Sequence, residues 1–389
     1  MSKESVASAI AGSCIGRFCA LFLGMPVGWV LSIAAVVVLF SNEGRAVKTD
    51  RALREGMAKV VSITADQVNP ATAGELVHVQ GLVSTEETLH DPLFGVSIRA
   101  LRLRRLVETY QWRQRSERHQ QQTAGGQCKT VTTYRYDQTW SAKLIDSSHF
   151  QEPFGHENPK SLPPFPSHDW EAKDFRLGQF TLQAGLREQV RSFAPLGIRV
   201  GEPPPSARQA GFRALDASFY QGADPRWPQI GDVRIVYESV PPTDVSIIAA
   251  QDGNVLGAYR TESGGKLEML EPGRQSAAEM FREAHFWNRV KTWLYRVGGF
   301  FALLIGYRLA LGPLTALANL LPGLLAGLTL ATGFLAFLLA VAVTLVTTSI
   351  AWVAYRPNIG LPMLTAGILL AILIGWWCRR EREPGSSTG

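Results

Sequence analysis

Cysteine is scarce in this chain, and its distribution excludes two kinds of stabilisation. The four cysteines are Cys14, Cys19, Cys128 and Cys378. Only Cys128 lies between residues 41 and 291, so this central stretch cannot contain an internal disulfide. The sequence also lacks any C-x-x-C segment or Cys/His cluster, which argues against a zinc site.

Catalytic and nucleotide-binding motifs are missing as well. The sequence has no G-x-S-x-G, no P-loop, no H-E-x-x-H and no G-x-G-x-x-G before a predicted helix. We therefore predict no catalytic residues, no cofactor and no metal. One alternative stays open, because His156, Glu157 and His168 lie in polar loops where they could bind a metal or exchange protons. A turn capped by Asn158 explains the first of these loops equally well.

The charge balance is modest. The chain has 39 Lys and Arg against 33 Asp and Glu, a net charge of +6. This balance fits basic residues that flank membrane helices, or a basic surface near anionic lipid headgroups. Basic and aromatic residues such as Arg104, Arg105 and Tyr136 could contact nucleic acid, but a solvated sheet face explains them better. We therefore predict membrane lipids and other membrane proteins as partners, and no nucleic acid.

Four long hydrophobic runs stand out against this background. They cover residues 18–40, 292–311, 324–355 and 361–378. Because about 20 apolar residues suffice to cross a hydrocarbon core about 30 Å thick, each run predicts a transmembrane helix. The predicted fold is one N-terminal and three C-terminal transmembrane helices that flank a large extramembrane α+β domain. That domain is β-rich and covers residues 41–291, and tails remain at 1–17 and 379–389.

The first run predicts a retained signal anchor. It is longer than the apolar region of a signal peptide, and no cleavage site is evident after it. A polar stop begins at Ser41. Four crossings place both termini on one side of the membrane, which we expect to be cytoplasmic. Flanking charges give poor guidance here, because long domains translocate largely regardless of charge.

Small and charged residues within the runs predict how the helices pack. Two ladders of small residues at four-residue spacing are Gly24, Gly28 and Ser32, and Gly323, Gly327 and Ala331. Small residues at this spacing let helices approach closely, so both ladders are candidate helix-packing faces. Ordinary tolerance of glycine in membrane helices is the alternative. Arg296 lies near the start of the second run, where we expect it to snorkel to the interface rather than be buried.

The central stretch begins with a helical pattern and continues with strand patterns. Residues 45–70 carry apolar side chains at loosely helical spacing. Val77, Val79 and Val83 then share one face of a strand, while His78 points to the other face. We expect one β-rich domain with inserted helices, and a small barrel is one arrangement that fits.

Two further patterns in this stretch concern its longest elements. Residues 96–112 and 128–145 are strand-like and are separated by a polar loop near residues 118–126, which predicts a long hairpin. Residues 276–294 predict an amphipathic helix that leads into the second hydrophobic run and that Ser276 can cap. That helix could lie in the membrane interface or pack on the domain.

Several segments resemble those of a known family. Phe40-Ser41-Asn42-Glu43-Gly44-Arg45-Ala46 resembles the TNEGRA signature that follows the first span in the LUMA (transmembrane protein 43) family. Further segments with such a resemblance are residues 91–96, 103–112, 155–159, 231–234 and 355–357, in the order of the family. Singly these segments are unspecific, but together they are specific and cover nearly the whole chain.

The resemblance implies four membrane spans, a large lumenal domain, self-association and no established enzymatic activity. Eukaryotic members lie in the endoplasmic reticulum and inner nuclear membrane, where they are linked to emerin and lamins. The Ala/Arg-rich termini, the Pro-rich middle and the missing N-x-[ST] acceptor instead indicate a bacterial relative, with its domain in the periplasm and its helices in the inner membrane. Emerin and lamins would not apply to such a relative.

We therefore predict an integral membrane protein that is a homo-oligomeric, non-enzymatic scaffold for membrane protein complexes. The alternative is a membrane-linked enzyme or lipid-handling protein that uses His156, Glu157 and His168.

Overall fold

The computed structural model describes residues 14–122, 128–196, 200–313, 325–358, 360–362 and 365 of the 389-residue chain. The chain divides into two compact units. The helical unit comprises the described parts of Met1–Ala58, Arg260–Leu267 and Ala278–Gly389. The β-domain comprises Lys59–Tyr259 and Glu268–Ala277, apart from the few residues not described.

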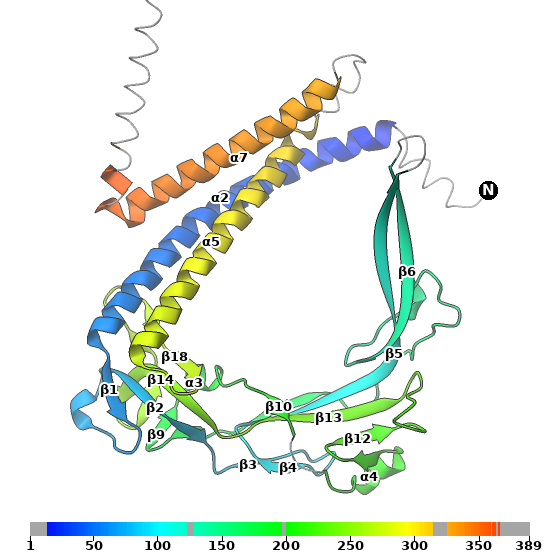
Figure 1. Ribbon diagram of the computed structural model, residues 1–389, viewed down its shortest axis with the longest axis vertical. Coiled ribbons are helices and arrows are strands. Elements are labelled where there is room, and N and C mark those ends of the chain that lie inside the picture. The colour runs from blue at the N-terminus through cyan, green and yellow to red at the C-terminus, as the bar shows by residue number, and fades with distance from the viewer. Residues whose placement is uncertain are drawn as a thin grey trace, which may run out of the picture. The chain divides into compact units, whose positions relative to one another are not determined.

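Three long helices make up most of the helical unit (Figure 1). They are α2 (Cys14–Lys59), α5 (Ala277–Ala310) and α7 (Leu325–Tyr355). Their common apolar core is formed by Ala35 and Leu39 of α2, Leu303 and Tyr307 of α5, and Ala336 and Ala340 of α7. Other apolar side chains of these helices face outward, among them Val30, Ile33 and Phe334, each more than 60% exposed. A helix that is apolar on both its packed and its outer faces is typical of a membrane span.

The first helix runs on beyond the predicted polar stop. The separate helix expected over residues 45–70 is the C-terminal half of α2, and it ends at Lys59. Ala46, Val47, Ala52 and Leu53 are buried there at helical spacing, so packing carries the helix through a charged sequence. The polar stop marks the end of the apolar surface and not the end of the helix.

Two of the described helices are long and apolar enough to cross a membrane, at Gly24–Lys59 and Ala331–Tyr355. The predicted run 292–311 lies in the C-terminal half of α5, which forms one continuous helix with the predicted amphipathic segment. The predicted fourth run at 361–378 lies almost entirely outside the described residues, as do most of the N-terminal tail and all of the C-terminal tail.

The first sheet of the β-domain contains the predicted valine strand. Its order is β1 (Val61–Thr64), β2 (Leu76–Ser84), β8 (Arg176–Leu177), β9 (Phe180–Leu182), β15 (Val255–Gly257), β14 (Thr243–Asp252) and β18 (Met269–Pro272). Because β2 also pairs with β14, the strands from β2 to β14 in this order form a closed cycle, as in a small barrel. Val77, Val79 and Val83 are fully buried on β2, as their spacing predicts.

The second sheet is built around a long hairpin. Its order is β11 (Arg213–Leu215), β12 (Ser218–Gln221), β13 (Val233–Val240), β5 (Arg102–Gln122) and β6 (Cys128–Ser141), and β10 (Ala194–Pro195) and β7 (His168–Glu171) pair with β13 and β5. Beyond Thr109, β6 is the only described strand that pairs with β5, and the two extend as a twisted ribbon (Figure 1). The predicted hairpin is confirmed, with β5 extending to Gln122, beyond the predicted Trp112, and β6 ending at Ser141, before the predicted Ile145.

Short elements complete the β-domain. They are the hairpin of β3 (Thr88–His90) and β4 (Ser97–Arg99), the helices α3 (Ala184–Arg187) and α4 (Pro205–Gln209), and the 3-10 turns η1 (Pro70–Thr72) and η2 (Ser147–His149). A further two-stranded sheet is formed by β16 (Tyr259–Arg260) and β17 (Lys266–Leu267).

A buried ion pair lies in the β-domain where a solvated sheet face was expected. Arg105 is 2% exposed, and its Nη1 lies 2.6 Å from Oδ1 of the fully buried Asp91. The hydroxyl of Tyr237 donates to the same carboxylate, and burial raises the pKa of this tyrosine far above its usual range. The expectation was wrong for Arg105, because its carboxylate partner lies outside the strand pair and was not part of the sequence pattern.

Candidate functional site

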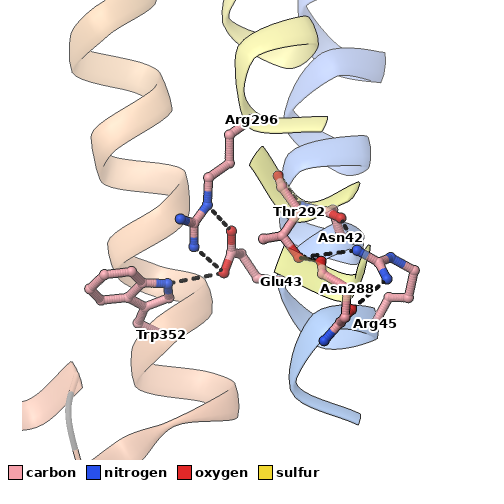
Figure 2. Close-up of polar contacts among 7 residues, drawn as sticks. All are labelled: Asn42, Glu43, Arg45, Asn288, Thr292, Arg296 and Trp352. Carbon is pink, nitrogen blue, oxygen red and sulfur yellow. Dashed lines mark hydrogen bonds and ion pairs between the residues drawn. The ribbon is translucent and has the colours of Figure 1, made fainter. Parts of the chain in front are cut away.

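The most extensive group of buried polar contacts in the helical unit lies at the polar stop of α2. We name it the interhelical polar cluster (Figure 2). It consists of Asn42, Glu43 and Arg45 of α2, Asn288, Thr292 and Arg296 of α5, and Trp352 of α7. Three of the members, Asn42, Glu43 and Arg45, belong to the segment that resembles the family signature.

Glu43 connects all three helices. Its side chain is 4% exposed and accepts hydrogen bonds from Arg296 Nε at 2.6 Å and Arg296 Nη2 at 2.9 Å. Its Oε2 also accepts a hydrogen bond from Trp352 Nε1 at 3.0 Å. A buried carboxylate is strongly destabilising without such partners, so this geometry fixes the arrangement of α2, α5 and α7. Arg296 is therefore 20% exposed in an ion pair with Glu43, a partner that the sequence analysis did not predict.

Arg45 and Asn288 form a second set of contacts between α2 and α5. Arg45 Nη1 donates to Asn288 Oδ1 at 3.0 Å, and Arg45 Nη2 donates to Asn42 Oδ1 at 2.8 Å. Asn288 Nδ2 in turn donates to the carbonyl of Ala46 at 3.0 Å. The side-chain amide of Asn288 thus accepts one hydrogen bond through its oxygen and donates another through its nitrogen. Such paired contacts hold α2 and α5 in one register.

Gly44 is required at its position by a close approach of α7. A Cβ built on Gly44 would lie 2.6 Å from Cζ of Tyr355, which is shorter than any real contact of this kind. The ring of Tyr355 also packs on Phe40, with ring centroids 5.3 Å apart. Glycine therefore lets the end of α7 rest directly on the backbone of α2.

The first predicted ladder of small residues lies against α5. A Cβ on Gly28 would lie 2.5 Å from the carbonyl oxygen of Gly306 and 2.6 Å from the amide nitrogen of Ala310. Gly24 faces Leu309, and Ser32 is buried beside Gly306. This ladder therefore packs two helices of the same chain, α2 and α5, against each other.

The second ladder is described only in part. Gly323 lies outside the described residues, Gly327 lies in the first turn of α7, and Ala331 is exposed. The described contacts of α7 with the other helices use Ala336 and Ala340, which are fully buried further along the same helix.

The alternative site at His156, Glu157 and His168 is not assembled by the described residues. The ring of His156 stacks on Tyr136, with centroids 3.9 Å apart, and Glu157 accepts from the amide of Gly155. His168 lies in β7, where its ring packs on Trp170. No hydrogen bond or ion pair in the described part of the chain joins His168 to the other two. Nor does any group of three His, Cys, Asp or Glu among those residues have the geometry of a metal site.

One histidine that the sequence analysis did not single out does have an ordered polar environment. His78 Nε2 lies 2.9 Å from the carbonyl of Gln275, so this nitrogen carries the proton. His78 Nδ1 then accepts from the hydroxyl of Ser62, 3.2 Å away on the neighbouring strand β1. Burial lowers the pKa of His78 and keeps the ring neutral near pH 7. The alternation of residues along β2 predicted only that the side chain of His78 points away from the valine face.

The apolar helices, the polar cluster between them and the large sheet-rich domain define a membrane protein. The family described as Transmembrane protein 43 matches residues 109–357. The chain is 35% identical to Transmembrane protein 43 of Rattus norvegicus over 86% of this chain and 85% of the relative. The protein of that name in Homo sapiens is 34% identical over 93% and 90%, and the Drosophila melanogaster homolog is 29% identical over 87% and 91%. The chain therefore belongs to the Transmembrane protein 43 family, and no solved structure gives a significant match.

Proposed function

We propose that this protein is a multi-pass, self-associating membrane scaffold that organises membrane protein complexes through its large domain. The proposal rests on one observation, namely that the side chains of the interhelical polar cluster are hydrogen-bonded to one another across the helices. The carboxylate of Glu43 is held by Arg296 and Trp352, and both side-chain groups of Asn288 are paired. Such a site holds the helices in one arrangement, which is what a scaffold requires.

The proposed topology has four spans, formed by the four hydrophobic runs. Two helices with span character support it, and the run at 292–311 supplies a third crossing if its two arginines, Arg296 and Arg308, are accommodated. The ion pair with Glu43 neutralises Arg296, and Arg308 lies near the end of the run, where its side chain can reach the interface. Both termini would lie in the cytoplasm, and the β-domain would lie in the periplasm or the lumen.

Cysteine labelling in sealed membranes tests this topology. The four native cysteines are first replaced by serine, and cysteines introduced singly at Ser5, Asp252 and Ser386 are then reacted with a membrane-impermeant maleimide. We expect Ser5→Cys and Ser386→Cys to react from the same side and Asp252→Cys only from the other. Labelling of the two terminal cysteines from opposite sides would contradict the four-span topology.

Self-association is proposed to use the second ladder of small residues. Gly327 is the candidate, because the ladder at Gly24 and Gly28 is already filled by α5. We expect Gly327→Leu to shift the full chain in detergent toward the monomer by light scattering. An unchanged oligomer size in this variant would remove Gly327 from the interface, and a monomeric wild type would refute self-association.

The scaffold role itself is tested by isolating the full chain from native membranes and identifying bound proteins by mass spectrometry. A reproducible set of membrane proteins should accompany the wild type and decrease when Glu43→Ala disturbs the helical unit. Recovery of the chain alone, under conditions that preserve other membrane complexes, would refute the role.

A further inference from the structure

We propose that the helical unit contains a binding site for a phosphate group, and that the phosphate belongs to the headgroup of an anionic phospholipid. The site is a cavity of about 450 Å³ beside the polar stop of α2. Its polar lining comes from Ser41, Arg45, Lys48 and Arg51 of α2, from Ser263 and from Tyr355 at the end of α7. We name it the cationic cavity.

The cationic cavity offers hydrogen-bond donors that have no acceptor among the described residues. Lys48 is exposed and has neither an ion-pair nor a hydrogen-bond partner there, and the hydroxyl of Tyr355 makes no hydrogen bond. Arg51 uses only Nη2, which donates to the carbonyl of Tyr355 at 2.9 Å. An oxyanion placed here would accept a hydrogen bond from the half-buried Tyr355 hydroxyl and pair with the exposed cations of Lys48 and Arg51.

No carboxylate of the described residues competes for these donors. Within that part of the chain no Asp or Glu lines the cavity, and the acidic residues near it along α2 have partners elsewhere. Asp50 pairs with Arg54 at 3.1 Å and with His285 at 3.3 Å. Glu55 accepts from the backbone amides of Glu262 and Ser263. Three cations around one cavity with no anion in its lining favour an anionic ligand.

The position of the cavity along the helices favours a lipid as the source of the phosphate. Val37 and Val38 are the last large apolar side chains of α2 exposed before the cavity, and Ser41 follows one turn later. Tyr355 is the last residue of α7, and its ring packs on Phe40 of α2. The exposed apolar surface of α2 and the helix α7 thus end at one level, where the headgroups of a bilayer would lie. Basic pockets between membrane helices are known to bind anionic headgroups.

The experiment uses the full chain in nanodiscs of phosphatidylcholine with a minor fraction of phosphatidylglycerol. The chain is then extracted into detergent, and the retained lipid is measured by native mass spectrometry. We expect Lys48→Gln and Arg51→Gln each to reduce phosphatidylglycerol retention about fivefold. Arg54→Gln is the matched control, because it removes the same charge from the same helix outside the cavity and its side chain is 74% exposed.

The outcomes separate a specific site from general surface charge. An equal loss in Arg54→Gln, or full retention in both Lys48→Gln and Arg51→Gln, would overturn the proposal. Circular dichroism of each variant verifies that the helices are intact. A further arm adds inorganic phosphate to the wild type before extraction. Displacement of the lipid by millimolar phosphate would support the phosphate site but overturn its assignment to a lipid.

Discussion

Replacement of Glu43 by alanine is expected to destabilise the helical unit strongly. The substitution leaves the guanidinium of Arg296 without its carboxylate partner, and it leaves the indole of Trp352 without its acceptor. Removal of one partner from a buried ion pair costs about 3–5 kcal/mol. Arg296 retains 20% exposure of its side chain, and its guanidinium lies 5.1 Å from the ring centroid of Trp293. Because water and this ring partly compensate the charge, we expect about 3 kcal/mol, the lower end of the range.

A double-mutant cycle isolates the contribution of the pair. Glu43→Ala, Arg296→Ala and the double variant are unfolded in a detergent titration that is followed by tryptophan fluorescence. If the two side chains stabilise each other, the double variant should lose about 1–3 kcal/mol less than the sum of the single losses. Arg289→Ala is the matched control, since Arg289 is exposed on the same helix two turns earlier.

Two results would refute this reasoning. Strictly additive losses would mean that Glu43 and Arg296 are not coupled, whatever their distance. A loss in Glu43→Ala no larger than that in Arg289→Ala would mean that the carboxylate does not hold the helices. Glu43→Gln should lie between wild type and Glu43→Ala, because its amide oxygen still accepts one hydrogen bond.

Three further predictions concern packing, the buried tyrosine and pH. Gly28→Ala should destabilise the α2–α5 pair by about 1–3 kcal/mol in the same titration, because the added Cβ would meet backbone atoms of α5. Gly298→Ala is the control and should not destabilise the pair, because its added Cβ has no other atom within 4 Å. Tyr237→Phe should lower the stability of the full chain by about 1.5–3 kcal/mol in urea unfolding, through loss of the bond to Asp91, and Tyr259→Phe serves as its control. Burial lowers the pKa of His78 in the folded chain. As the pH decreases below the unfolded pKa of about 6.5, the unfolded chain therefore binds this proton more readily than the folded chain does, and the free energy of unfolding decreases. His78→Gln should flatten the dependence of the thermal unfolding temperature on pH below about pH 6.5, and an unchanged slope would contradict this assignment.

The sequence predicted the elements whose signal is local. The apolar runs at 18–40 and 324–355 could be recognised because continuous apolar composition is a local signal that needs no knowledge of a partner. In the structure they lie in α2 and α7. Val77, Val79 and Val83 were correctly assigned to a buried face by their period of two. The boundary after Phe40 was misjudged because a polar sequence ends an apolar surface, while tertiary packing decides where the helix ends.

The polar cluster was beyond the reach of these local signals. Glu43 pairs with residues 253 and 309 positions away in the chain, and nothing in one sequence relates them. Arg296 alone looks like an interfacial arginine, and only the structure pairs it with Glu43. The available signal was coarse, namely one acidic and one basic residue at the edges of two apolar runs.

The contiguity of the segment from Asn42 to Arg45 has a geometric reason. Four successive residues complete slightly more than one turn of a helix of 3.6 residues per turn, so they point in all directions around its axis. A helix at a surface uses only one face, and its important residues recur every three or four positions. Around α2 the partners lie on several sides at one level: Glu43 contacts Arg296 and Trp352, and Gly44 contacts Tyr355. An unbroken motif inside a helix therefore indicates a point where that helix is enclosed, and here the enclosure comes from α5 and the end of α7.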